Sequence, residues 1–148
     1  MNRNFKYIFF TTMSLMSVCV LNLAHAAPQV TRLTPPSELF TSGQAAPVIA
    51  RFLPDQRFDL QATIVPDSAE KTISKAVFYM DGQEIKLPVA LRSCATGCQP
   101  KLAKNSAIVT LRAMSIAKPG LHQFQIEATQ SDGQSVKASG NFEIVPWQ

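Results

Sequence analysis

Regular alternation of apolar and polar residues marks the last thirty positions of the chain and constrains what they can form. Two runs alternate in this way, 122–129 and 136–144, and Ser131-Asp132-Gly133 lies between them. Side chains on a β-strand point to opposite faces in turn, so this period of two predicts half-buried strands. The Asp-Gly step is typical of a tight turn between paired strands. The sequence therefore predicts an antiparallel hairpin whose apolar face needs a second sheet to cover it.

Earlier segments carry the same signal and supply that second sheet. Residues 57–65 alternate most regularly, and Asp81-Gly82 is a second hairpin turn. Residues 88–106 are expected to be a surface crossover between the sheets. Together the chain shows about seven short strands with turn signals about every ten residues, which is typical of an all-β, immunoglobulin-like antiparallel β-sandwich. The other expected strands are 47–53, 73–80, 83–87 and 107–114.

The first 26 residues read as an export signal. Arg3 and Lys6 precede an apolar run over 7–23, and Ala24-His25-Ala26 is a small-x-small exit. Retention as an N-terminal anchor is the less favoured interpretation, because Thr and Ser interrupt the apolar run. A lipid anchor on Cys19 is not expected, because the residue before it is Val18, whereas lipoprotein signals have Gly, Ala or Ser at that position. We therefore expect a signal peptide (1–26), a Pro/Ser/Thr-rich linker or leading arm (27–46) and an immunoglobulin-like domain (47–148). Within the leading arm, residues 30–33 are a candidate short strand. The mature protein is expected to be periplasmic or secreted, not lipidated and without stable membrane insertion.

The charge of the expected mature chain argues against a nucleic-acid partner. It keeps 12 of the 14 basic residues and all 10 acidic residues, for a formal charge of +2. No Lys/Arg cluster remains that would follow a phosphate backbone. The expected partner is another exported protein.

Two cysteines, Cys94 and Cys98, remain after the signal. An even count in an oxidising compartment predicts a disulfide between them, closing a short loop worth about 2 kcal/mol in the chain-entropy model. Redox activity or metal binding is the alternative. It is disfavoured because redox pairs usually have two intervening residues at the start of a helix, whereas Ala95-Thr96-Gly97 and Pro100 read as a turn.

Two motifs together resemble bacterial immunoglobulin-like modules of secreted proteins. They are AVFYMDG at 76–82 and PGLHQFQIEATQSDG at 119–133. The resemblance spans about residues 48–145 and implies the fold more than a function, since such modules accompany many secreted enzymes and adhesins. Some secreted alkaline phosphatases carry a similar module.

The sequence departs from antibody domains in the interior. There is no cysteine on either core strand and no tryptophan on the third, so the inter-sheet disulfide and its packing partner are not expected. Phenylalanines must fill that space, and the parity of the strands assigns it to Phe58, Phe78, Phe124 and Phe142.

Little in the expected mature chain points to catalysis. His122 is its only histidine and shares the inward parity of Phe124, so we expect a structural corner in which it bonds back to the preceding backbone. Asp81 and Asp132 are explained by their turns. A single histidine cannot build a multi-histidine metal centre, and no serine stands in a nucleophile elbow. We expect no enzyme activity, no metal and no cofactor.

A binding role is left, and three surfaces are candidates for it. One is the outward face of the last hairpin, which is rich in amides. The second consists of Tyr79 and Trp147, the aromatic side chains most able to stack on sugar rings. The third is a sheet edge that accepts a strand of another chain. The candidate contact residues are Tyr79, Gln123, Gln125, Glu127 and Trp147.

These observations favour an exported, non-catalytic module that contacts or positions another protein. One alternative is a periplasmic inhibitor or assembly factor that uses the Cys94–Cys98 loop. A further alternative is a small hydrolase, or the non-catalytic accessory part of a secreted hydrolase or phosphatase.

Overall fold

The computed structural model describes residues 26–35, 49–94 and 102–147, and these form nine β-strands and no helix. The all-β prediction is confirmed. The strands are β1 (Gln29–Thr34), β2 (Ala50–Phe52), β3 (Phe58–Val65), β4 (Ile73–Met80), β5 (Gln83–Glu84), β6 (Ala90–Ser93), β7 (Ala107–Met114), β8 (Gly120–Gln130) and β9 (Ser135–Ile144).

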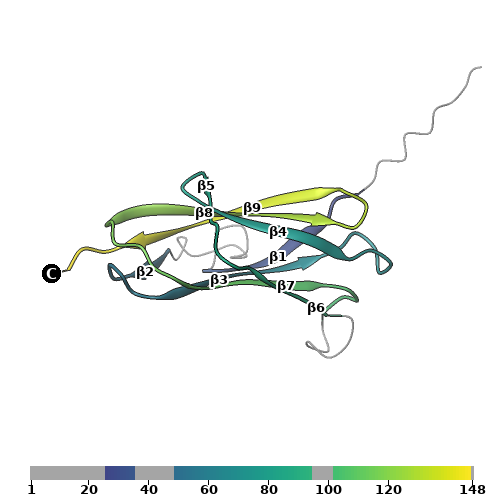
Figure 1. Cartoon of the computed structure of the whole chain (residues 1–148), viewed down its shortest axis with the longest axis horizontal. Helices are drawn as coiled ribbons and strands as arrows, with labels where there is room; N and C mark the ends of the chain where they lie inside the picture. The colour runs from purple at the N-terminus through teal and green to yellow at the C-terminus, as the bar shows by residue number, and fades with distance from the viewer. Residues whose placement is uncertain (1–25, 36–48, 95–101, 148) are drawn as a thin grey trace, which may run out of the picture.

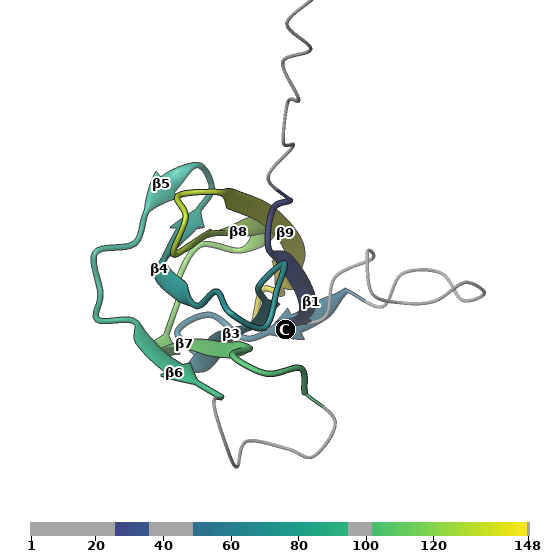
Figure 2. The ribbon, with the colours of Figure 1, turned by 90° about the vertical axis from the view of Figure 1, so that its right-hand side faces the viewer.

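The strands form two sheets that face each other, as Figures 1 and 2 show. One sheet has the order β1-β3-β7-β6, and the other has the order β2-β9-β8-β4-β5. Lettered along the chain, the first sheet follows the A-B-E-D order of immunoglobulin domains and the second contains their G-F-C sheet. The predicted immunoglobulin-like sandwich is therefore confirmed. The ladder between β2 and β9 is parallel, whereas the other ladders are antiparallel.

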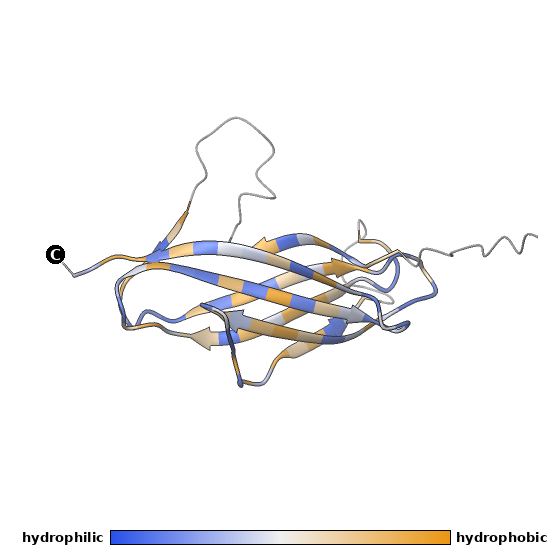
Figure 3. Cartoon of the chain, turned by 90° about the horizontal axis from the view of Figure 1, so that it is seen from above, coloured by the Kyte–Doolittle hydropathy of each residue, from blue (hydrophilic) through white to orange (hydrophobic). Residues whose placement is uncertain are grey.

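The core lies between the sheets and is rich in phenylalanine, as expected. Phe78, Phe124 and Phe142 are completely buried, and Phe58 is nearly so. Figure 3 shows the alternation that produces this core, with hydrophilic and hydrophobic residues following one another along the strands. Burying one such side chain stabilises the fold by about 1.5–3 kcal/mol. Phe142 is central, because its ring contacts those of Phe58 and Phe124 at centroid distances of 5.1 and 6.2 Å.

Two strands exceed the expected seven. The segment 88–106 was expected to be a surface crossover, but Ala90–Ser93 form β6, an exposed edge strand paired with β7. All four residues of β6 are exposed, so the sequence shows no alternation of apolar and polar residues there. The strand forms because its backbone pairs with β7. β1 lies within the expected linker or leading arm at 27–46 and pairs with β3, so the sandwich also includes residues 29–34.

The expected signal peptide lies almost entirely outside the described residues, which begin at Ala26. None of the described residues lies in a helix with the length and apolarity that a membrane crossing requires. The export and cleavage of residues 1–26 stay predictions.

Candidate functional site: the outer face of the five-stranded sheet

The outer face of β4, β8 and β9 brings together four of the five predicted contact residues. Tyr79 on β4 lies opposite Gln125 on β8, and Val77 lies opposite Glu127. Gln123 lies opposite Asn141 of β9. Inward neighbours such as Phe78 and Phe124 anchor these strands in the core, so the alternate side chains must point outward. We call this surface, formed by Val77, Tyr79, Gln123, Gln125, Glu127, Lys137 and Asn141, the polar face.

The charges on the polar face are satisfied within it. The Tyr79 hydroxyl donates a hydrogen bond to the Glu127 carboxylate at 3.3 Å, and the Lys137 ammonium lies 3.8 Å from the same carboxylate oxygen. Burial and the nearby Glu127 charge raise the pKa of Tyr79, so its hydroxyl stays a donor at neutral pH. Tyr79 and Glu127 also line a small pocket of about 110 Å³, together with Lys75, Val77 and Thr129. The face therefore offers amides and one tyrosine with little net charge.

Trp147 does not belong to the polar face. It lies three residues beyond the end of β9, in the exposed C-terminal tail (Figure 1). The pairing of strands brought the other four residues together from two segments of the chain, whereas no ladder includes Trp147.

The predicted disulfide lies partly outside the described residues. Cys94 is buried directly after β6, and its backbone N–H donates to the Ser106 carbonyl at 2.7 Å. Cys98 falls in 95–101, outside the described residues. The Cys94–Cys98 pairing and a contact role for this loop stay predictions.

His122 stands at the start of β8, where two acceptors hold its ring. Nε2 lies 2.8 Å from the backbone carbonyl of Lys118, four residues upstream. Nδ1 lies 2.7 Å from Oδ2 of Asp81. The ring also stacks on Phe142, with centroids 5.6 Å apart. The side chain thus closes the corner between β7 and β8 and ties it to the turn after β4.

Both partners of the His122 ring can only accept hydrogen bonds. A backbone carbonyl and an ionised carboxylate have no proton to donate, so satisfying both contacts requires a proton on each ring nitrogen. Although burial opposes the charge, the hydrogen bonds to Asp81 and Lys118 raise the pKa of His122 above its ordinary value. Burial likewise opposes ionisation of Asp81, but His122 and the Gln123 N–H lower its pKa overall. The corner is a small ion pair.

Asp81 is the residue that sequence reasoning missed at this corner. Its turn role was expected, and it does adopt a positive φ of 49°. Its carboxylate also accepts a hydrogen bond from the Gln123 N–H at 2.9 Å and pairs with His122, both more than forty positions away. Only the Asp-Gly dipeptide was visible in the sequence, and it explains the turn without the second role.

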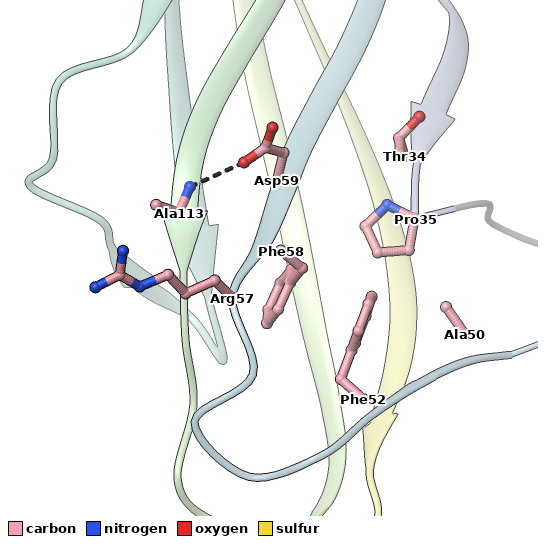
Figure 4. A pocket seen from close by; sticks show the side chains of 8 residues that line it. All are labelled: Thr34, Pro35, Ala50, Phe52, Arg57, Phe58, Asp59 and Ala113. Carbon is pink, nitrogen blue, oxygen red and sulfur yellow. Dashed lines mark hydrogen bonds between the residues drawn. The ribbon is translucent and has the colours of Figure 1, made fainter.

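An apolar pocket opens at the edge of the sandwich near β1 and β2 (Figure 4). Its volume is about 490 Å³, and its floor is the stacked pair Phe52 and Phe58, with ring centroids 4.4 Å apart. The Asp59 carboxylate at its rim accepts a hydrogen bond from the Ala113 N–H at 2.9 Å. No predicted site residue lines this pocket. The lining residues are Thr34, Pro35, Ala50, Phe52, Arg57, Phe58, Asp59 and Ala113.

The described residues contain no group of three or more His, Cys, Asp or Glu side chains placed to hold a metal ion. Lys71 lies between two acids and bridges the carboxylates of Asp67 and Asp132 at 2.8 and 2.9 Å. There the lysine ammonium already serves as the cation between the two acids.

No protein-family model matches the chain, and no curated protein matches its sequence. Solved structures similar to it include CopC from Methylosinus trichosporium OB3b, at a TM-score of 0.43 and 10% identity, covering 82% of this chain and 96% of that chain. SGBP-B of the Bacteroides ovatus mixed-linkage glucan utilization locus, solved with a mixed-linkage heptasaccharide, has a TM-score of 0.43 and 21% identity, covering 83% of this chain and 25% of that chain.

Fibronectin(III)-like modules of Clostridium thermocellum CbhA are also similar. Their TM-score is 0.36 at 14% identity, covering 68% of this chain and 93% of that chain. Likeness of this degree carries no information on ligand, partner or activity. The resemblance to accessory modules of secreted alkaline phosphatases stays a prediction.

Proposed function

We propose that this protein is an exported, non-catalytic immunoglobulin-like module that binds another exported protein through the polar face. One observation carries the proposal. Tyr79, Gln123, Gln125 and Glu127 occupy neighbouring positions on one sheet face, where the ladders of β4, β8 and β9 hold them together.

The chemistry of the polar face fits a protein partner. Amide side chains offer both donors and acceptors, and tyrosine combines apolar area with a hydroxyl at low cost in conformational entropy. Protein interfaces are depleted in charged residues at their centre. Here Glu127 is compensated by Tyr79 and Lys137, so docking would not bury an unpaired charge.

The state of His122 supports a non-catalytic role. Both ring nitrogens are engaged, with Asp81 and with the Lys118 carbonyl. A general base needs a free nitrogen within hydrogen-bond reach of a substrate proton. The residue's contacts instead match those of a structural corner.

Export is part of the proposal and rests on the sequence. Residues 1–26 combine a basic start, an apolar middle and a small-x-small exit. The first described strand begins at Gln29, so cleavage after Ala26 would leave every described strand intact.

The test places a photo-crosslinking residue at Gln125 in the chain expressed in its own cells. The matched control is Gln61, a half-buried glutamine that faces outward on the other sheet. We expect a defined crosslinked protein from position 125 and none from position 61. The crosslinked protein, identified and purified, should then lose affinity for a Gln125→Arg variant but not for Gln61→Arg.

Two results would contradict the proposal. The first is an equal crosslinking pattern from positions 125 and 61. The second is substrate turnover by the purified protein that His122→Ala abolishes while its circular dichroism stays that of the folded chain.

A further inference from the structure

The C-terminal tail leaves the sandwich where β9 ends (Figure 1). Exposed apolar residues lie close to this point in the strand pairing and in the tail. Leu53, Leu121 and Trp147 are 39%, 65% and 71% exposed, and they are three of the five large exposed apolar side chains in the described part of the chain. Apolar side chains scattered singly over a surface need no explanation, but a gathering of them marks a contact surface.

A hollow lies among these side chains. Its volume is about 530 Å³, and it is lined by Arg51, Leu53, Glu143, Val145 and Pro146. The ladders place Arg51, Glu143 and Leu121 in one row across β2, β9 and β8. Arg51 Nε donates to the Glu143 carboxylate at 2.9 Å, so the hollow combines an apolar wall with a compensated ion pair.

Trp147 stands beside this hollow without lining it. Pro146 disfavours the helical region for Val145, so the chain leaves β9 in an extended conformation. The indole is then one residue past its own hollow and mostly in solvent. The same end of the molecule thus presents both a large aromatic group and an empty apolar hollow.

We propose that a second copy of this chain docks at this end, with Trp147 of each copy lying in the hollow of the other. A two-fold axis makes the two contacts identical, so one arrangement buries both indoles. Leu53 and Val145 offer the indole an apolar wall. The exposed guanidinium of Arg51 offers it a planar cation on which aromatic rings stack.

Charge and symmetry favour a second copy over an unrelated protein as the occupant. The row that borders the hollow carries one positive and one negative side chain, Arg51 and Glu143, so two copies meet without net repulsion. The group that fits the hollow is already present on the same end of the chain. This dimer goes beyond the proposed function, because none of the residues that line the hollow belongs to the polar face.

The chain contains a single tryptophan, so its fluorescence reports on Trp147 alone. The purified chain, with residues 1–26 removed, would be diluted through a concentration series while emission wavelength, acrylamide quenching and sedimentation are measured. As concentration rises, we expect emission to move to shorter wavelength, quenching to fall and the sedimenting mass to approach twice that of one chain, all with one midpoint.

Two variants make the test specific. Leu53→Glu places a charge in the hollow and should abolish all three changes. Leu91→Glu is the matched control, since Leu91 is 38% exposed and lies on β6 of the other sheet, and it should leave them intact. Leu121→Lys, at a more exposed position of the same end, repeats the test if Leu53→Glu fails to fold.

Three outcomes would overturn the proposal. One is emission and mass that stay those of a monomer with exposed tryptophan at every concentration. Another is protected tryptophan in a sedimenting monomer, which would mean that the indole packs on its own chain. The last is an emission change caused by phosphatidylglycerol vesicles but not by concentration, which would assign this end to a membrane surface.

Discussion

Replacing Asp81 by Asn removes the charge from the corner around His122 while keeping hydrogen bonding within reach. An asparagine tolerates the positive φ of this position, and its carbonyl can accept from the Gln123 N–H as the carboxylate does. Its NH₂ group can donate to Nδ1 of a neutral His122, whose Nε2–H still donates to the Lys118 carbonyl. The substitution therefore tests the ion pair separately from the packing.

The pKa shifts of His122 and Asp81 determine how the stability of the corner changes with pH. The pKa of His122 is raised above its ordinary 6.5 in the folded chain, so its stabilisation is fully present below 6.5 and is lost as pH rises through the folded value. The pKa of Asp81 is lowered below its ordinary 3.8, so its stabilisation is present above 3.8 and is lost as pH falls. The Asp81–His122 ion pair therefore stabilises the fold most between pH 3.8 and pH 6.5.

The contacts set the size of the effect. A hydrogen bond to a charged group contributes about 1.5–3 kcal/mol and a neutral one about 1 kcal/mol. Because the Asp81 side chain is 49% exposed, water screens part of the difference, which leaves about 1 kcal/mol for the charge. Asp81→Asn should therefore cost about 1 kcal/mol near pH 5.5 and nothing above the folded pKa of His122. His122→Ala, which also removes the contact with Phe142, should cost about 2–4 kcal/mol.

Urea unfolding followed by circular dichroism at a series of pH values measures these differences directly. The unfolding free energies of the wild type and Asp81→Asn should differ at mildly acidic pH and converge as pH rises past neutrality. If the unfolding free energies of the wild type and Asp81→Asn differed by the same amount at every pH in that range, the assignment of an ion pair to this corner would be refuted. If the wild type instead became more stable relative to the variant from pH 6 to pH 8, the pKa of His122 would be lowered by folding and not raised.

Three further substitutions test other parts of the fold. Phe142→Ala should cost about 3–5 kcal/mol in urea unfolding, because a completely buried ring at the centre of the core is lost; a cost like that of a surface residue would contradict the described packing. Lys71→Met should make acid unfolding begin at a higher pH. The Gln134 N–H and Lys71 lower the pKa of Asp132 to about 2, so its stabilisation is lost only as pH falls from 3.8 toward 2, and an unchanged acid transition would exclude this role. Ala113→Gly should leave stability in thermal unfolding unchanged or raise it by up to about 1 kcal/mol. Ala113 has a φ of 57°, a region that glycine adopts without steric cost. A clear loss of stability would argue against backbone strain at Ala113.

The hairpin of β8 and β9 shows what local pattern can establish. Its alternation predicted the strands, the turn at Ser131-Asp132-Gly133 and the burial of Phe124 and Phe142, all of which the fold confirms. The same parity placed Gln123, Gln125 and Glu127 on the outward face. These features depend on neighbours two residues apart, so they can be derived before any long-range contact is known.

β2 and β6 show where that reasoning ends. β2 has three residues and β6 has four, and each strand owes its conformation to a ladder with a distant partner, β9 for β2 and β7 for β6. β6 carries too few alternations to be distinguished from a loop, whereas β2 lies within the strand expected at 47–53, and only its parallel pairing was not foreseen. The parallel direction of β2 and the edge position of β6 are properties of the assembled sheets.

The sequence by itself determined which residues face inward and where the chain turns, because side-chain direction along a strand alternates with every residue. Only the tertiary structure decided which residues share a site. It placed Asp81 against His122 across forty-one positions, set Tyr79 opposite Gln125, and left Trp147 beside a hollow made by β2 and β9. Those neighbours arise from strand order and register, which depend on how two whole sheets bury their apolar faces together.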